Sequence, residues 1–257
     1  MTRRRVTLAE VKASINSNVP AHFTVRWFGR PLGDLMTPAF SAAGFNANQV
    51  TTLRALIAFG GLGLFLVPGF VWGPVCAAMV FYFCFILDCV DGNIARLQND
   101  ASYWGKFMDG IADFIFVQGA PLAAGVWAWQ YDGSAEYLLL GALVTVTTLA
   151  SQMLRARLSF MREWMVSLSG PIDPAVEEKV RTARKVQAFI GETYVNGTFF
   201  APLILIATPL FGVQPYLIAL ALVQFLPELI WIGATLSEAS HLLARHRRSK
   251  HAQPLTD

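Results

Sequence analysis

The sequence predicts an all-α membrane protein: a six-transmembrane-helix bundle, preceded by an N-terminal interfacial amphipathic helix, with both termini in the cytoplasm. The first observation behind this prediction is composition. Hydrophobic residues make up 54% of the 257 residues and charged residues only 14%, whereas a soluble domain carries about 25% charged residues. The second is a series of apolar stretches near the roughly 20 residues that a helix needs to cross a bilayer. The third is the distribution of basic residues.

The N-terminal segment, residues 1–50, is expected to be cytoplasmic or interfacial. Within residues 8–45, apolar side chains such as Phe23, Trp27 and Leu35 alternate with basic ones. This mixture is typical of an amphipathic helix that lies along a membrane surface. An ordinary polar leader is the alternative interpretation.

A transmembrane domain is expected over residues 51–238 and a basic cytoplasmic tail over residues 239–257. Turn residues at Pro68 and Gly69, and at Asp132 to Ser134, separate neighbouring apolar stretches. The six spans are predicted at residues 51–67, 70–87, 107–131, 137–154, 194–211 and 216–236. Between the fourth and fifth, the i,i+4 pair Glu177 and Arg181 indicates a helical cytoplasmic excursion.

The basic residues fix the expected orientation. All 20 Lys and Arg residues lie in or beside the segments that a six-span layout places on one side of the membrane. The positive-inside rule puts that side in the cytoplasm, so a multi-pass protein of the cell membrane is expected. The formal net charge of +3, without a basic run interleaved with aromatics, argues against nucleic acid as a partner. Membrane lipids are the expected counter-charge.

Four carboxylates stand at the cytoplasmic ends of two apolar segments: Asp88, Asp91, Asp109 and Asp113. The first two are three residues apart and the last two four apart, so on helices each pair shares a face, with a rise of ~4.5 Å and ~6 Å. If the two helices are neighbours, the four side chains converge. Repulsion and desolvation then require proton uptake or cations. Two divalent ions would balance the charge, and oxygen ligands favour Mg²⁺ or Mn²⁺.

The same segment carries the pattern DxxDGxxARx8GxxxDxxxD, matched at every fixed position: Asp88, Asp91, Gly92, Ala95, Arg96, Gly105, Asp109 and Asp113. In this pattern the chain resembles the CDP-alcohol phosphotransferase family (CDP-alcohol phosphatidyltransferases), which are integral membrane enzymes. The resemblance implies transfer of a phosphoalcohol, expected to be phosphatidyl, from a CDP-linked lipid donor to an alcohol or phosphorylated alcohol. CMP is released, and the pathway is phospholipid biosynthesis. It also implies a homodimer.

The resemblance also implies roles for the aspartates. Asp88, Asp91 and Asp109 would hold one divalent cation, and Asp88, Asp109 and Asp113 a second. Asp113 would also be the catalytic base that takes the proton of the acceptor hydroxyl. Metal pairs roughly 3.5–4 Å apart recur in displacements at phosphorus, and the expected reaction is an in-line attack on the β-phosphorus.

Several residues are candidates for binding the donor nucleotide and its phosphates. Gly92 and Ala95 would leave a shallow helix surface for the nucleotide, and the Arg96 guanidinium could bind a diphosphate oxygen. Gly105, one turn before Asp109, suggests that the donor approaches the helix backbone closely at this point. By looser resemblance the set also includes Ser102 and the NxxT residues Asn48 and Thr51. A helix N-cap is the alternative for the NxxT residues.

Two arginines after the fourth span, Arg155 and Arg157, could bind a phosphorylated acceptor, although topology alone also explains basic residues there. Glu228 lies inside the sixth span, where a carboxylate is either functional or a paired structural group, for example at a dimer contact.

Two rival functions are a cation carrier, since intramembrane carboxylates also mark ion pathways, and a catalytically idle partner subunit. The cytoplasmic position of the aspartates argues against the first and the complete pattern against the second.

Overall fold

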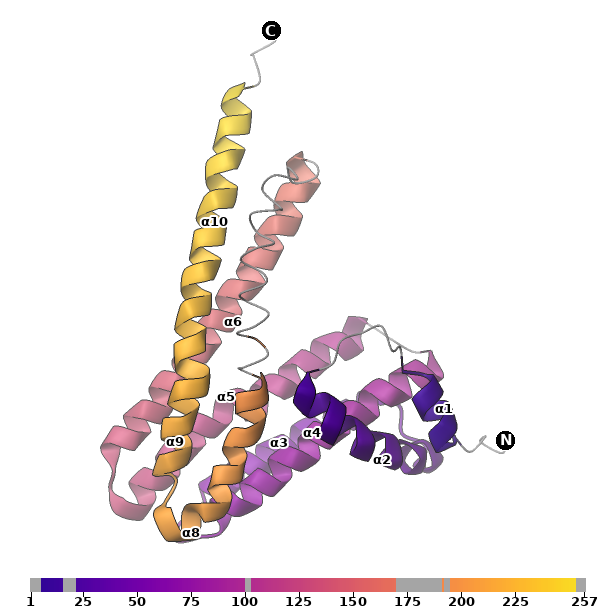
Figure 1. Cartoon of the computed structure of the whole chain (residues 1–257), viewed down its shortest axis with the longest axis vertical. Coiled ribbons are helices and arrows are strands. Elements are labelled where there is room, and N and C mark those ends of the chain that lie inside the picture. The colour runs from indigo at the N-terminus through magenta and orange to yellow at the C-terminus, as the bar shows by residue number, and fades with distance from the viewer. Residues whose placement is uncertain (1–5, 16–21, 100–102, 170–190, 192–194, 253–257) are drawn as a thin grey trace.

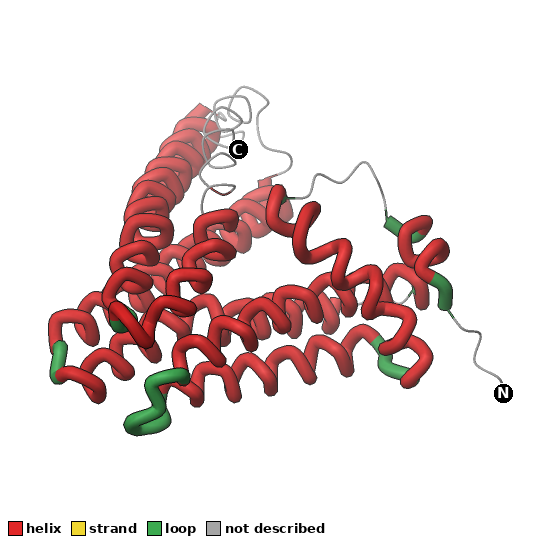
Figure 2. The backbone as a smooth tube through the Cα atoms, turned by 60° about the horizontal axis from the view of Figure 1, so that its bottom comes forward, coloured by secondary structure: helices red, strands yellow, loops and turns green. Residues whose placement is uncertain are grey.

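A computed structural model describes residues 6–15, 22–99, 103–169, 191 and 195–252 of the chain. Within these ranges the elements are helical and no strand occurs (Figure 2). The helices are α1 (Leu8–Ala13), the π-helical turn η1 (Val25–Gly29), α2 (Arg30–Ala43), α3 (Ala47–Phe65), α4 (Gly73–Gln98), α5 (Tyr103–Asp132), α6 (Ala135–Ser169), the 3₁₀ segment η2 (Ala201–Ala207), α8 (Thr208–Phe211), α9 (Gln214–Leu220), the π-helical turn η3 (Ala221–Phe225) and α10 (Leu226–Ala252) (Figure 1). Ser102, Glu177 and Arg181 lie outside the described residues.

The predicted turns separate the helices where expected. α3 ends before Pro68 and Gly69, and α4 begins a few residues later. Between α5 and α6, Gly133 has a positive φ of 77°, a conformation that favours glycine. The backbone N–H of Ser134 donates to the Asp132 carboxylate at 3.0 Å and closes this turn.

Four helices among the described residues are long and apolar enough to cross a membrane: Gly73–Gln98, Trp104–Asp132, Ala135–Ser167 and Gln214–Ser240. The predicted first span corresponds to the 19-residue α3, and the fifth to the shorter apolar segment Val195–Phe211. The all-helical class is thus confirmed for the described residues, and their four candidate spans agree with a multi-pass membrane protein. The six-span layout, the interfacial position of the N-terminal helix, the cytoplasmic termini and the domain boundaries stay predictions.

Three helices extend well beyond the predicted apolar stretches. α4 continues from residue 87 to Gln98, α6 from residue 154 to Ser169 and α10 from residue 236 to Ala252. Hydropathy marks the part of a helix that suits hydrocarbon, whereas backbone hydrogen bonding carries the helix on through polar residues. Asp88 and Asp91 therefore lie inside α4 rather than at its end.

The helix α3 is the centre of the part of the bundle that carries the aspartates. It packs along both α4 and α5, whereas α4 and α5 touch each other only locally. Buried side chains fill these contacts: Val50, Leu87, Val90 and Ile94 between α3 and α4, and Ala58, Phe81 and Phe116 where α5 joins them. Helix α2 lies against α4 (Figure 1).

Helices α6 and α10 are held together by ion pairs. The Arg155 guanidinium donates to both oxygens of Glu228, at 3.0 and 3.2 Å, and its Cζ lies 4.1 Å from the centroid of the Trp231 ring. Further along, Arg162 and Glu238 approach to 3.4 Å. Glu228 is fully buried, so its partner within the chain explains how this carboxylate is tolerated.

Replacing Glu228 by alanine is expected to lower the free energy of unfolding by about 1.5–3 kcal/mol, because a charged hydrogen-bonded pair is lost and Arg155 keeps its charge. Thermal unfolding of the purified protein in detergent measures the change. The exposed Glu163 on α6 supplies the matched control, since Glu163→Ala should change stability by no more than about 0.5 kcal/mol. Equal effects of the two substitutions would contradict a structural role for the pair.

Candidate active site

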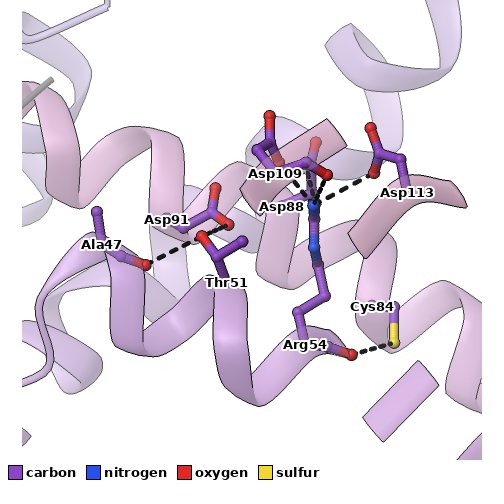
Figure 3. Close-up of polar contacts among 8 residues, drawn as sticks. All are labelled: Ala47, Thr51, Arg54, Cys84, Asp88, Asp91, Asp109 and Asp113. Carbon is purple, nitrogen blue, oxygen red and sulfur yellow. Dashed lines mark hydrogen bonds and ion pairs between the residues drawn. The ribbon is translucent and has the colours of Figure 1, made fainter. Parts of the chain in front are cut away.

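The four aspartates of the sequence pattern converge where α3, α4 and α5 meet (Figure 3). One carboxylate oxygen from each of Asp88, Asp91 and Asp109 lies within 4.8 Å of the others. The side chain of Asp113 is 64% exposed, whereas Asp91 is 7% exposed. The site therefore grades from a buried carboxylate on α4 to an accessible one on α5.

A fifth charged residue, Arg54 of α3, stands in the middle of these carboxylates. Its guanidinium pairs with Asp88, lies 2.6 Å from the Asp109 carboxylate and 3.3 Å from the Asp113 carboxylate. It also donates to the backbone oxygen of Asp109 at 3.1 Å. At 3% exposure, Arg54 is a buried cation that bridges α4 and α5, which have little direct contact.

Sequence reasoning missed Arg54, because it counted this residue only toward membrane topology. One signal could have found it. A lone charged residue near the start of an apolar helix needs a partner, and Arg54 follows Thr51 by three residues, so both side chains lie on the same face of α3.

Thr51 brings the NxxT segment into contact with the site. Its hydroxyl lies 2.8 Å from Asp91 Oδ2 and 3.1 Å from the carbonyl oxygen of Ala47, and it can donate its single proton to either. The N-cap of α3 is Asn46, which forms a capping box with Gln49. The alternative interpretation of Asn48 and Thr51 as the N-cap was therefore wrong; Asn48 lies in the first turn of α3, half-buried.

The candidate donor-binding residues of α4 lie on one face of the helix beside the aspartates. The nearest atoms to a Cβ on Gly92 would be those of the Arg96 guanidinium, at 3.5 Å or more, so packing among the described residues does not demand glycine there. Ala95 is half-buried and Arg96 exposed, and Arg96 donates to Asn93 Oδ1 at 2.6 Å. Gly105 lies in the first turn of α5.

The two candidate acceptor arginines are not in contact with the aspartates. Arg155 is engaged by Glu228 and Trp231, and Arg157 is exposed on α6. Gln152, three residues before Arg155, does line the cavity next to the site. A role for Arg155 in binding a phosphorylated acceptor would require it to leave Glu228.

A cavity of about 420 Å³ adjoins the carboxylates. Arg54, Asp88 and Asp113 supply its charged lining, and much of the remaining wall is aromatic, from Phe81, Phe85, Phe114, Phe116 and Phe199. Cavities of this size suit small organic ligands, with a few polar groups fixing their orientation. The arrangement brings a charged site and an apolar chamber together.

Comparison with known proteins decides the family. A family model described as CDP-alcohol phosphatidyltransferase matches residues 45–226, which include α3, all four aspartates and every residue that lines the cavity except Val25. The chain belongs to the CDP-alcohol phosphatidyltransferase family. It is accordingly a transferase of phosphorus-containing groups, which moves a phosphatidyl group from a CDP-linked donor in phospholipid biosynthesis.

Similar curated proteins carry the name CDP-diacylglycerol–glycerol-3-phosphate 3-phosphatidyltransferase. One from Pectobacterium atrosepticum is 30% identical over 151 residues, which are 57% of this chain and 76% of that protein. One from Salmonella choleraesuis is 30% identical over 56% of this chain and 74% of its own length. One from Yersinia enterocolitica is 29% identical over 53% and 69%. The resemblance to CDP-alcohol phosphatidyltransferases, first seen in the aspartate pattern, is thus confirmed over much of the chain.

Proposed function

We propose that this CDP-alcohol phosphatidyltransferase transfers the phosphatidyl group of CDP-diacylglycerol to an acceptor of the glycerol-3-phosphate type, with two divalent cations held by its aspartates. The observation that carries the proposal is the meeting of Asp88, Asp91 and Asp109, with Asp113 one helical turn further along α5, at an apolar-walled cavity. The names of the relatives support glycerol-3-phosphate as the first acceptor to test.

The donor atoms fit hard divalent cations. Carboxylate oxygens from Asp88, Asp91 and Asp109 come within 4.8 Å of one another, and oxygen ligands of this kind suit Mg²⁺ or Mn²⁺. Asp88, Asp109 and Asp113 would hold the second ion. When bound, such ions stabilise negative charge that develops on phosphate oxygens. Four carboxylates and Arg54 carry a net charge of −3, so two divalent cations leave the site positive, which favours a diphosphate.

Asp113 is the proposed base. Its carboxylate is the most exposed of the three that Arg54 contacts, and the residue lines the cavity. An acceptor hydroxyl held there would transfer its proton to Asp113 as its oxygen bonds to the β-phosphorus and the bond from that phosphorus to CMP breaks. Arg54 would hold Asp113 in position through its guanidinium.

The donor is proposed to lie over the surface of α4 that Gly92, Ala95 and Arg96 form, with Asn48, Thr51, Ser102 and Gly105 around it. The Arg96 guanidinium would lie 3.5 Å from a Cβ on Gly92, so the small residue and the proposed phosphate ligand are neighbours, which supports this placement. The Arg96 guanidinium would bind the diphosphate with its planar set of donors. Of the two candidate acceptor arginines we favour Arg157, which is exposed, because Arg155 is engaged by Glu228.

Replacing Thr51 by valine is expected to weaken divalent-cation binding about tenfold, because a hydroxyl that orients a ligand carboxylate contributes 10–100-fold to metal affinity. Titration of purified protein with Mn²⁺, followed by electron paramagnetic resonance, measures the affinity directly. Thr52→Val is the matched control, since the Thr52 hydroxyl donates to the carbonyl of Asn48 at 2.8 Å. Unchanged Mn²⁺ affinity in Thr51→Val would contradict an orienting role.

We further propose that the active site faces the cytoplasm at the boundary of the cell membrane and that the protein is a homodimer. The distribution of basic residues supports the orientation. A site at this boundary receives a water-soluble nucleotide on one side and acyl chains on the other.

The function is tested by CMP release from the purified full chain, reconstituted in lipid, across CDP-linked donors and acceptor alcohols. We expect release with CDP-diacylglycerol and glycerol-3-phosphate in Mg²⁺ or Mn²⁺, and none after chelation. Asp109→Asn is the inactive control. Release with another acceptor alone would overturn the acceptor, and release that persists in chelator would overturn the metal requirement.

A further inference from the structure

A buried polar cluster joins α2 to α4 next to the proposed donor surface. The Asn93 side-chain amide donates to Asp34 Oδ1 at 2.9 Å and lies 3.0 Å from Thr37 Oγ1. All three are nearly inaccessible: Asn93 is 1% exposed, Thr37 0% and Asp34 6%. Thr37 in turn donates to the carbonyl oxygen of Gly33 at 2.7 Å.

The orientation of the Asn93 amide is fixed by its partners. An ionised carboxylate only accepts hydrogen bonds and a guanidinium only donates them. Asp34 therefore faces Asn93 Nδ2, and Arg96, which donates at 2.6 Å, faces Asn93 Oδ1. A flipped amide would place its NH2 group against the Arg96 guanidinium and its oxygen against the Asp34 carboxylate. The Asn93 amide, held in one orientation, therefore connects α2 to the Arg96 guanidinium.

Helix α2 is seated too closely on α4 to shift easily. A Cβ on Gly33 would lie 2.5 Å from the Cβ of Cys89, and one on Gly29 would lie 2.8 Å from the sulfur of the same residue. The outward side chains Leu32 and Leu35 are 47% and 64% exposed. One face of α2 is thus matched to α4, and the other presents apolar surface.

Arg96 needs this support. Its side chain is exposed on α4. A long side chain in such a place loses considerable rotamer entropy when it is ordered. A fixed hydrogen-bond acceptor orders the guanidinium before the ligand arrives, which reduces the entropic cost of binding.

We propose that Asp34 and Asn93 are positioning residues of the donor site: α2, through Asp34 and then Asn93, holds the Arg96 guanidinium in place for the donor diphosphate. The inference rests on the role proposed above for Arg96. It makes α2 a part of the donor site in addition to any role at the membrane surface. Neither Asp34 nor Asn93 touches the reacting atoms.

The test is a double-mutant cycle on donor KM and kcat, measured by CMP release from the full chain in lipid. Asn93→Leu keeps the volume and removes the amide; we expect donor KM to rise about tenfold, with kcat within about twofold, because a charged hydrogen bond is lost.

In an Arg96→Ala background, Asn93→Leu should raise donor KM no further. Asp34→Asn keeps an acceptor oxygen and should leave donor KM within about threefold of the native value. Asp34→Leu has no acceptor and should raise donor KM further than that.

Thr145→Val is the matched control, because it removes another buried interhelical hydrogen bond, from Thr145 to the carbonyl of Gln118 at 2.9 Å, and should lower the unfolding temperature without changing donor KM. If Arg96→Ala leaves donor KM unchanged, the proposed role of Arg96 is wrong. If Arg96→Ala raises donor KM but Asn93→Leu does not, the positioning role is wrong and the role of Arg96 stands. The same conclusion follows if the two increases in donor KM multiply in the double variant. Should Asn93→Leu fail to fold, Asp34→Leu replaces it in the same cycle.

Discussion

Replacing Asp113 by asparagine is expected to slow CMP release by about 10²–10⁴-fold, because the variant keeps the shape of the side chain but cannot accept the acceptor proton. Donor binding should persist, since Asp88, Asp91 and Asp109 still offer their three oxygens within 4.8 Å. The rate of CMP release gives the catalytic effect, and calorimetric titration with CDP-diacylglycerol in Mg²⁺ gives the binding effect.

The matched control is Asp132→Asn, an exposed aspartate at the far end of the same helix, which should leave turnover unchanged. Substantial turnover in Asp113→Asn would remove this residue from the role of base. Loss of donor binding in the same variant would instead make Asp113 chiefly a binding residue.

Replacing Arg54 by methionine is expected to destabilise the protein by about 1.5–3 kcal/mol in the presence of a chelator, because partly exposed carboxylates lose a charged hydrogen-bond donor that they share. The carboxylates of Asp88, Asp109 and Asp113 share this single cation. Added Mg²⁺ should recover much of the loss, because divalent cations replace the missing charge. Arg54→Lys should be intermediate, since an ammonium cannot reproduce the planar fork of donors.

Thermal unfolding of the purified protein, with chelator and with Mg²⁺, measures both effects without any assay of activity. Arg26→Met, at an exposed position before α2, is the matched control and should respond to Mg²⁺ as the native protein does. If Arg54→Met and the native protein gain the same stability from Mg²⁺, Arg54 is not a counter-charge of the carboxylates.

The sequence alone predicted the helical membrane class and the reaction class, and both are confirmed. These predictions are local in origin. Hydropathy over about 20 residues identifies a span, and the fixed rise of a helix places Asp88 with Asp91, and Asp109 with Asp113, on shared faces. The aspartate pattern lies within a continuous stretch of chain, so its match to a family needs no tertiary information.

Only the tertiary structure decided which groups those aspartates face. Arg54 and Thr51 reach Asp88 and Asp91 across the α3–α4 contact, Asn93 meets Asp34 across α2 and α4, and Glu228 finds Arg155 on α6. Each pair is separated by 34 to 73 residues, and spacing along one helix does not determine which face a second helix covers. That choice is made by side-chain packing and the pairing of buried charges, which is why the sequence yielded the aspartates but the structure was needed to find the residues that hold them.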